Sequence, residues 1–359
     1  MRILYALGRH FVPERRSGAE LSAHTLLQIL TAEGQQCEVV AVAARGWRLL
    51  KNRIQALAWR RPLAYLDRRN GYITHRAFPG GVVQLVGERI AEFRPDLVIT
   101  ALEASPAIAA VAVRARVPVL LSILDNLYLW LDGPLPETPL MGLICNSLFT
   151  RDRVRERFGL SPEVVYPCVR FEDYRITRIE PRFVTFVNPV YHKGLDKALR
   201  LAKLLPHRRF QFVRGWKQPW RIALENELRV RAAANVTYRW RTSDMRSIYA
   251  RTKVLVVPSL WEESFGRVIL EAQVSGIPVI ATRIGGIPEA LGSGGILLPP
   301  DAPAEEWATA VESVLNDDAL RARLSEQARA NTERPEFDPQ RIASHFLEVA
   351  AAHIGRCSA

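Results

Sequence analysis

The chain has 359 residues, of which 48% are hydrophobic and 24% charged, which excludes a disordered or fibrous protein and leaves room for two globular domains. Its formal net charge of +12 favours an anionic partner, and nucleic acid, an acidic membrane surface and phosphorylated small molecules all fit. Four scattered cysteines without metal-ligand spacing indicate reduced thiols, and no stretch has the length of a signal peptide or a membrane span, so we expect a cytoplasmic protein.

The first half of the sequence alternates short apolar strands with amphipathic helices. The near-continuous apolar run 117–124 is typical of a strand that is buried on both faces. Repeated alternation of this kind predicts a parallel sheet with right-handed crossovers. The expected strands are 3–7, 37–42, 97–100, 117–124, 143–145 and 164–166, and the expected helices are 19–32, 82–93 and 107–115.

The segment 45–76 interrupts this alternation. It carries nine basic residues and a single acidic one, Asp67, with Trp47, Trp59 and several aliphatic residues between them. Basic residues interleaved with apolar and aromatic ones are typical of an interfacial helix, so we expect the segment to contact an anionic membrane or a lipid-pyrophosphate acceptor. The alternative is a solvated basic face whose apolar residues pack on the N-terminal core.

A charged stretch at 174–182 marks a change in composition, and strands and helices alternate again after it. We therefore predict an α/β protein with an N-terminal Rossmann-like domain at 1–173, a second one at 174–338 and a final helical segment at 339–359. A crevice between two such domains is the expected ligand site. The expected strands are 183–187, 210–213, 236–238, 254–257 and 279–281, and the expected helices are 195–204, 219–231, 266–274, 303–316, 319–331 and 340–353.

The most informative stretch is 254–299, where a buried strand leads through Glu262-Glu263-Ser264-Phe265-Gly266 into a helix. The start of a helix offers free backbone N–H groups and the positive end of the helix dipole, and Gly266 lets a ligand approach the backbone closely. A pyrophosphate or a sugar hydroxyl fits there. Glu271, about two turns into the helix, is placed to accept hydrogen bonds from the hydroxyls of a ribose.

This stretch resembles the donor site of the retaining glycosyltransferases of family 4, the group 1 glycosyltransferases, which have the GT-B fold. Their signature is a pair of glutamates separated by seven residues, with Phe-Gly after the first, and Glu263, Phe265-Gly266 and Glu271 match it. The segments that follow in the family are matched by Ser275-Gly276-Ile277-Pro278-Val279 and Gly285-Gly286-Ile287-Pro288-Glu289.

Looser matches extend over most of the chain. They are Ser17-Gly18-Ala19-Glu20, Tyr166-Pro167-Cys168-Val169 and His192-Lys193-Gly194. The resemblance implies a GT-B arrangement, in which two Rossmann-like domains face each other across a cleft and the C-terminal helix crosses back to the N-terminal domain. It also implies that Lys193 reaches the donor pyrophosphate.

The sequence departs from the family at two positions. Asn188 stands where an arginine normally precedes the Lys-Gly pair, so one phosphate-neutralising charge is missing or is supplied elsewhere, for which Arg267 is the candidate. Leu124 stands where many members carry a histidine, and Asp125 or Asn126 is then expected to contact the acceptor or the donor sugar.

The resemblance implies a hexosyltransferase that moves a sugar from a nucleoside-diphosphate sugar to a glycan, glycolipid or lipid-linked sugar, without a cofactor. No Asp-x-Asp pair occurs, so no metal is expected to bridge the diphosphate. Glu263 and Lys193 are the expected catalytic residues, and Gly18, Asp125 and Asn126 are expected at the acceptor or between the domains. The expected donor-binding residues are Asn188, Lys193, Ser264, Phe265, Gly266, Arg267 and Glu271.

Two alternatives remain open on the sequence alone. One is a sugar-nucleotide epimerase on the same fold, and the other is a scaffold that has lost catalysis and binds a nucleotide sugar or another anion. A basic nucleic-acid-binding protein is suggested only by charge, and no recognition helix or RNA motif accompanies it, so no nucleic acid is expected. The enzyme is expected on the cytoplasmic side, including a peripheral position on the inner face of the membrane.

Overall fold

The computed structural model describes residues 1–44, 64–126, 128, 135–177, 180–215 and 218–358. These divide into two compact units, one formed by Met1–Cys168 with Pro339–Ala359 and the other by Val169–Asp338. The chain passes between the units at 168/169, whereas the composition shift placed the boundary at 173/174. Among the described residues, no helix is long and apolar enough to cross a membrane.

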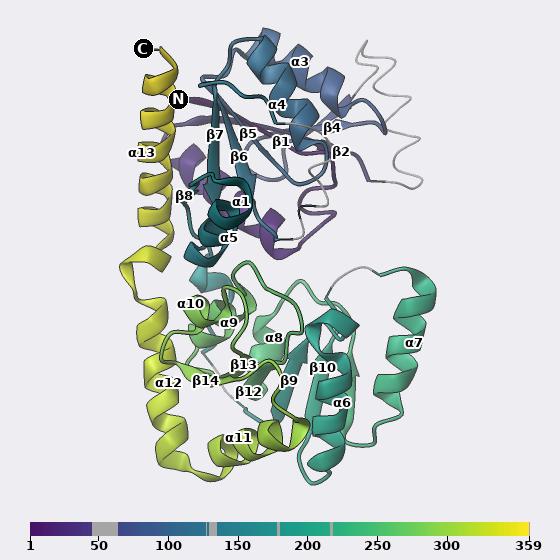
Figure 1. Ribbon diagram of the computed structural model, residues 1–359. Coiled ribbons are helices and arrows are strands. Elements are labelled where there is room, and N and C mark those ends of the chain that lie inside the picture. Colours follow the sequence, from purple (N-terminus) through teal and green to yellow (C-terminus); the bar gives the residue numbers. More distant parts are fainter. Residues whose placement is uncertain (45–63, 127, 129–134, 178–179, 216–217, 359) are drawn as a thin grey trace. The chain divides into compact units, whose positions relative to one another are not determined.

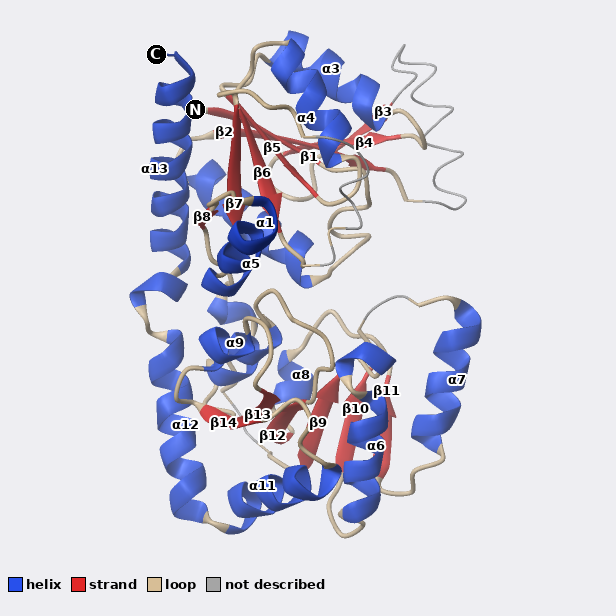
Figure 2. Cartoon of the chain, in the orientation of Figure 1, coloured by secondary structure: helices blue, strands red, loops and turns tan. Residues whose placement is uncertain are grey.

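Unit 1 is built on an eight-stranded sheet with the strand order β3-β4-β2-β1-β5-β6-β7-β8. Figure 2 draws the strands of both units in red. Neighbouring strands are parallel except for the antiparallel pair β3–β4. The central strands β5 and β6 are buried along their whole length, which explains their continuous apolar sequence. The strands are β1 Arg2–Ala6, β2 Gln36–Val42, β3 Ala64–Asp67, β4 Ile73–Ala77, β5 Leu97–Ala101, β6 Val119–Ile123, β7 Met141–Cys145 and β8 Glu163–Val164.

The helices of unit 1 are α1 Gly18–Ala32, α3 Val82–Phe93, α4 Ser105–Arg114, α5 Leu148–Phe158 and α13 Pro339–Ser358. The last of these, α13, lies beside α1 although more than 300 residues separate them in sequence (Figure 1). Its Ile342, Phe346 and Ala350 are fully or almost fully buried in the core that β1 and α1 share. The expected return of the C-terminal helix to the N-terminal domain is therefore confirmed.

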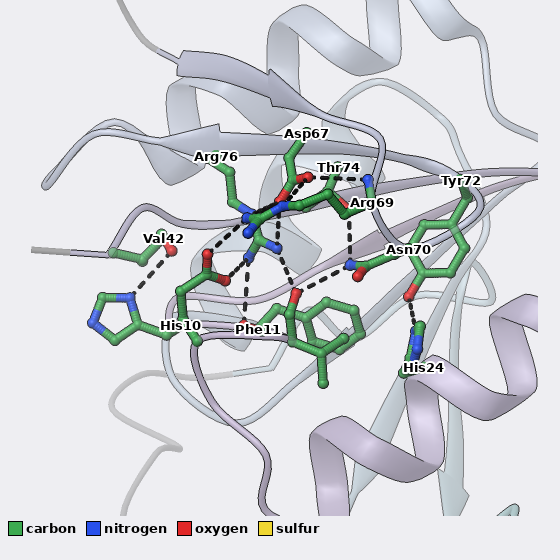
Figure 3. Close-up of polar contacts among 12 residues, drawn as sticks. His10, Phe11, His24, Val42, Asp67, Arg69, Asn70, Tyr72, Thr74 and Arg76 are labelled. Atoms are coloured by element: carbon green, nitrogen blue, oxygen red, sulfur yellow. Dashed lines mark hydrogen bonds and ion pairs between the residues drawn. The ribbon is translucent and has the colours of Figure 1, made fainter. Parts of the chain in front are cut away.

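The described end of the basic segment is a β-hairpin, so the expectation of an interfacial helix is wrong for residues 64–76. Arg76 on β4 is fully buried, and its guanidinium lies 3.0 Å from Asp67 Oδ2 and 2.9 Å from Glu14 Oε2 (Figure 3). Asp67 also accepts a hydrogen bond from Arg69 Nε. A buried cation needs such partners, so Arg76 joins the β1–α1 loop to the hairpin and is not available to a membrane. Residues 45–63, with the tryptophans, lie outside the described residues.

Unit 2 is built on a six-stranded parallel sheet with the order β11-β10-β9-β12-β13-β14. Its core contains Phe186, Phe212, Val256 and Trp307, all fully or almost fully buried. The strands are β9 Phe183–Val187, β10 Phe210–Val213, β11 Val236–Arg239, β12 Thr252–Val257, β13 Val279–Thr282 and β14 Gly295–Leu298. The helices are α6 Leu195–Leu204, α7 Trp220–Arg231, α8 Arg246–Tyr249, α9 Val268–Gln273, α10 Ile287–Leu291, α11 Ala304–Asn316 and α12 Asp318–Thr332.

Candidate active site

Three loops of unit 2 meet at one edge of its sheet. They follow the carboxyl ends of β9, β12 and β13, and because these strands are parallel, the loops emerge on the same side. The β9–α6 loop contains a short 3-10 helix, Tyr191–Lys193. The β12–α9 loop contains Glu263, and the β13–α10 loop contains Gly285-Gly286.

Glycines allow these loops to approach each other more closely than side chains would permit. Gly194 has φ +88°, and a Cβ there would lie 2.0 Å from the carbonyl oxygen of Pro258. Gly285 has φ +60°, and a Cβ there would lie 2.3 Å from the carbonyl oxygen of Glu263. Gly286 N–H donates to that same oxygen over 2.7 Å. The two glycine turns thus pack against the β12–α9 loop, one at Pro258 and the other at Glu263.

Glu263 and Lys193 form an ion pair in this loop cluster, and both side chains are largely buried. The hydroxyl of Ser259 donates a further hydrogen bond to Glu263 Oε1 over 2.8 Å. Burial by itself raises the pKa of Glu263, but the charge of Lys193 and the hydrogen bonds from Lys193 and Ser259 lower the pKa below its usual value. The Glu263 carboxyl group beside Lys193 is therefore ionised at neutral pH. Lys193 Nζ also lies 5.2 Å from the centre of the Trp261 ring.

The second glutamate, Glu271, has a different set of partners. Arg267 Nε donates to its Oε1 over 3.0 Å, and the hydroxyl of Tyr249 donates to its Oε2 over 3.1 Å. Arg267 Nη2 in turn donates to the hydroxyl of Tyr174 over 3.1 Å. Burial raises the pKa of Glu271, and the charge of Arg267 offsets only part of that rise. The signature glutamates therefore differ in electrostatics, since the pKa of Glu263 is lowered and that of Glu271 is raised.

The helix after the signature is shorter than the sequence predicts. α9 begins at Val268, so Phe265 and Gly266 precede it, and Glu271 is the fourth residue of the helix rather than two turns into it. Gly266 has φ +99°, which only glycine adopts readily. Phe265 is buried and packs against Phe337 with ring centres 5.7 Å apart. Phe265 therefore holds this loop on the unit 2 core.

Asn188 occupies the position of the missing arginine, directly after β9. Its φ of +63° lies in the left-handed region, which asparagine tolerates better than most residues. A Cβ at Gly215 would lie 2.0 Å from Asn188 Oδ1, so the asparagine side chain occupies the space beside that glycine. The guanidinium of Arg267, the suggested replacement, binds Glu271 and Tyr174.

The residues expected at the acceptor lie in unit 1. Gly18 is the first residue of α1, after the N-cap Ser17, and Asp125 and Asn126 follow β6. Asp125 Oδ1 accepts a hydrogen bond from the N–H of Tyr128 over 3.3 Å. Ala19 and Leu124 pack against the same apolar cluster, so the structure brings the start of α1 and the end of β6 together.

Sequence reasoning missed Ser259, Tyr249 and Tyr174, which contact the signature glutamates and Arg267. Ser259 could have been found, because it follows β12 by two residues at the carboxyl end of a buried strand. The tyrosines carry no such signal. Within the described part of the chain, no cluster of three His, Cys, Asp or Glu side chains could hold a metal ion.

The fold and both halves of the sequence match known glycosyltransferases. Residues 172–331 match the model of glycosyl transferases group 1, and residues 16–173 match that of Glycosyltransferase Family 4. Anabaena Alr3699/HepE, solved in complex with UDP-glucose, is similar with a TM-score of 0.78 and 19% identity, over 98% of this chain and all of that one. Sucrose-phosphate synthase from Thermosynechococcus elongatus is similar with a TM-score of 0.77 and 16% identity, over 98% and 99% of the two chains.

Curated relatives match over a shorter range. The D-inositol 3-phosphate glycosyltransferase of Corynebacterium kroppenstedtii is 42% identical over 108 residues, which are 30% of this chain and 23% of the relative. That of Corynebacterium glutamicum is 43% identical over 88 residues, 24% of this chain and 21% of the relative. The match thus spans less than a quarter of the length of these relatives. The two family models, the shared fold and these partial matches together lead to one assignment: the chain belongs to the group 1 glycosyltransferases and has the GT-B fold.

Proposed function

We propose that the enzyme transfers a sugar, with retention of anomeric configuration, from a nucleoside-diphosphate sugar to a hydroxyl-bearing acceptor. The observation that supports this most is the buried pair of Lys193 and Glu263, which the glycine turns hold at the carboxyl edge of a Rossmann-like sheet. A cation fixed there suits a diphosphate, and a carboxylate beside it suits sugar hydroxyls. The UDP-glucose complex of a protein with the same fold agrees with this class of donor.

In the proposed reaction the bond between the anomeric carbon and the diphosphate oxygen breaks, and the acceptor oxygen bonds to that carbon. The acceptor hydroxyl gives its proton to the leaving diphosphate oxygen. Negative charge grows on the leaving diphosphate while the sugar resembles an oxocarbenium ion. Lys193 and the backbone N–H groups of the Ser264-Phe265-Gly266 loop stabilise the diphosphate. Glu263 holds the sugar hydroxyls, and its bond to Lys193 keeps the ammonium group in place before the donor arrives.

Glu271 is proposed to bind the ribose of the donor. A carboxylate has about four acceptor positions, so the bonds from Arg267 and Tyr249 leave room for ribose hydroxyls. Arg267 then acts by keeping Glu271 ionised and oriented, and Asn188 takes the place beside the donor that an arginine fills in relatives. We also propose that the reaction needs neither a metal nor a cofactor.

The acceptor is proposed to be a carbohydrate or a lipid-linked sugar bound by unit 1 near Gly18, Asp125 and Asn126. The basic residues of 45–63 are proposed to bind an anionic membrane or a lipid pyrophosphate, which would place the enzyme on the inner face of the membrane. Co-sedimentation with anionic vesicles tests this part. The quadruple change of Arg48, Lys51, Arg60 and Arg61 to glutamine should reduce binding, and unchanged binding would contradict it.

A nucleotide screen tests the central proposal. UDP, GDP, ADP, CDP and TDP are each added in a thermal unfolding assay, and a ligand at 100 times its Kd should stabilise the protein by about 2.7 kcal/mol. Glu271→Gln should weaken the best nucleotide about 10- to 100-fold, because a hydrogen bond to a charged group contributes about 1.5 to 3 kcal/mol. Glu306→Gln, an exposed change on α11, is the control.

Turnover then separates transfer from the other functions of the fold. A transferase releases the nucleoside diphosphate from its sugar donor only when an acceptor is present. An epimerase interconverts the donor sugar without an acceptor, and a protein that has lost catalysis binds the donor and releases nothing. Equal binding of nucleotide by the wild type and Glu271→Gln would contradict the ribose assignment.

A further inference from the structure

Helix α7 of unit 2 exposes large apolar side chains on its outer side. Trp220, Leu224 and Leu228 follow each other at intervals of four residues, so they lie along one side of the helix, and they are 70%, 49% and 59% exposed. We call these three residues the α7 stripe. Ile222, on another side of α7, is also exposed. Several exposed apolar residues in a row on one helix mark an interaction site more often than a single exposed apolar residue does.

The stripe does not result from a helix that fails to pack. The inner side of α7 is formed by Ala223, Asn226 and Val230, which are buried, and Val230 belongs to the core of unit 2. α7 packs beside β11 at the outer edge of the sheet (Figure 2). The helix therefore has two apolar sides, and only one of them serves the fold.

Arginines and a further tryptophan accompany the stripe. The guanidinium of Arg221 lies 5.3 Å from the centre of the Trp220 ring. Trp240, which follows β11, is 59% exposed, and the guanidinium of Arg214 lies 5.2 Å from the centre of its ring. Trp220 begins a helix that follows β10, so both tryptophans lie at the carboxyl edge of the same parallel sheet. The segment 208–251 contains eleven basic and three acidic residues, so its charge favours an anionic partner.

The size of the stripe argues against a second copy of the chain as its partner. A helix of 12 residues is about 18 Å long and about 10 Å wide, so it offers on the order of 200 Å². A stable dimer needs about 800 Å² from each partner. A bilayer needs no matching surface, because a helix with tryptophan and leucine on one side and arginine beside them lies in the interface between headgroups and acyl chains.

We propose that the α7 stripe, with Trp240 and the neighbouring arginines, docks unit 2 on an anionic phospholipid bilayer. The carboxyl edge of the sheet, where Lys193 and Glu263 lie, then stands near the lipid surface together with the two tryptophans. This inference concerns other residues than 45–63 and does not depend on the transfer reaction. It fails or holds separately from the proposed transfer reaction, because vesicle binding requires no donor, and the stripe variant separates it from vesicle binding by 45–63.

The test uses the full chain and two kinds of vesicle. One consists of phosphatidylcholine alone, and the other contains about 30% phosphatidylglycerol as the anionic lipid. We expect the wild type to co-sediment with the anionic vesicles and to be released as salt rises. Changing all three stripe residues to serine should reduce the bound fraction at least about tenfold. The matched control changes three exposed leucines outside α7 to serine and should bind as the wild type does; these are Leu148, Leu160 and Leu204.

Three outcomes would overturn the inference. The first is a wild type that stays in the supernatant with anionic vesicles at low salt, and the second is a stripe variant that binds as tightly as the wild type. The third is a dimer in light scattering that the stripe variant abolishes while vesicle binding persists, which would assign the stripe to a second copy. Nucleotide binding by the stripe variant checks that unit 2 is folded. The double variant Arg221→Gln with Arg241→Gln keeps the stripe intact and tests how much the arginine charges contribute to vesicle binding.

Discussion

Gly285→Ala should disable the enzyme by moving Glu263. The added Cβ would lie 2.3 Å from the carbonyl oxygen of Glu263 and 2.6 Å from its nitrogen, about 1 Å short of the 3.4 Å at which ordinary contact begins. Both contacts are backbone atoms, so no rotamer change relieves them. A displacement of about 1 Å at a reacting group can cost about 100-fold in rate. We expect the release of nucleoside diphosphate to fall by about that factor.

The stability change of this variant has two parts that a control can separate. A left-handed alanine costs about 1 to 2 kcal/mol, and forced contact in a packed region adds about 1 to 3 kcal/mol. Gly159 has φ +68° and no atom within 4 Å of an added Cβ, so Gly159→Ala should show only the first part and full turnover. Urea unfolding and turnover of both variants measure this. If Gly285→Ala keeps turnover within threefold of Gly159→Ala, the close approach does not position Glu263.

The remaining predictions address the sugar-binding carboxylate of Glu263, the need for a metal and the buried charges of unit 1. Glu263→Ala should depress turnover and leave the affinity for the bare nucleoside diphosphate within about threefold, as calorimetry would show, because the carboxylate is assigned to the sugar. Activity should survive excess EDTA, and a loss restored by magnesium would assign charge neutralisation to a metal. The pKa of Asp67 is lowered to about 2, since the bonds from Arg69 and the charge of Arg76 outweigh the effect of burial. The stability from Asp67 is therefore present above about pH 4 and lost as pH falls toward 2, and acid unfolding should show a loss of about 2 kcal/mol that Asp67→Asn lacks.

The sequence predicted the elements that are buried and regular. Helix 82–93 and strand 183–187 have the predicted bounds, because their apolar patterns repeat with the period of the element. α5 was not predicted, since only Thr150 and Val154 of its eleven residues are buried and the pattern is weak. Its local signals are at its two ends: the hydroxyl of Ser147 accepts from the N–H of Thr150 as an N-cap, and Gly159 is the left-handed C-cap residue.

The residues of the candidate site also fall into those that the sequence could predict and those that it could not. Lys193 and Glu263 follow parallel strands, so topology alone predicts that they approach each other, and the structure places them in an ion pair. The pair of Arg267 and Glu271 has a spacing of four residues, from the N-cap of α9 to its fourth residue. Sequence reasoning passed over this signal in favour of a phosphate-binding role for the arginine. Tyr249 and Tyr174 lie 22 and 97 residues away from Glu271 in sequence, and only the packing of unit 2 brings them to this cluster.

The split of unit 1 affects the order in which the chain can fold during synthesis. Unit 2 is continuous, from Val169 to Asp338, whereas the core of unit 1 needs Ile342, Phe346 and Ala350 from α13. The ribosome therefore releases the first 168 residues long before their last core helix, and unit 2 can complete its own core in between. Until α13 docks, β1 and α1 expose an apolar surface, so the nascent N-terminal unit is the part of this enzyme that most needs protection from aggregation.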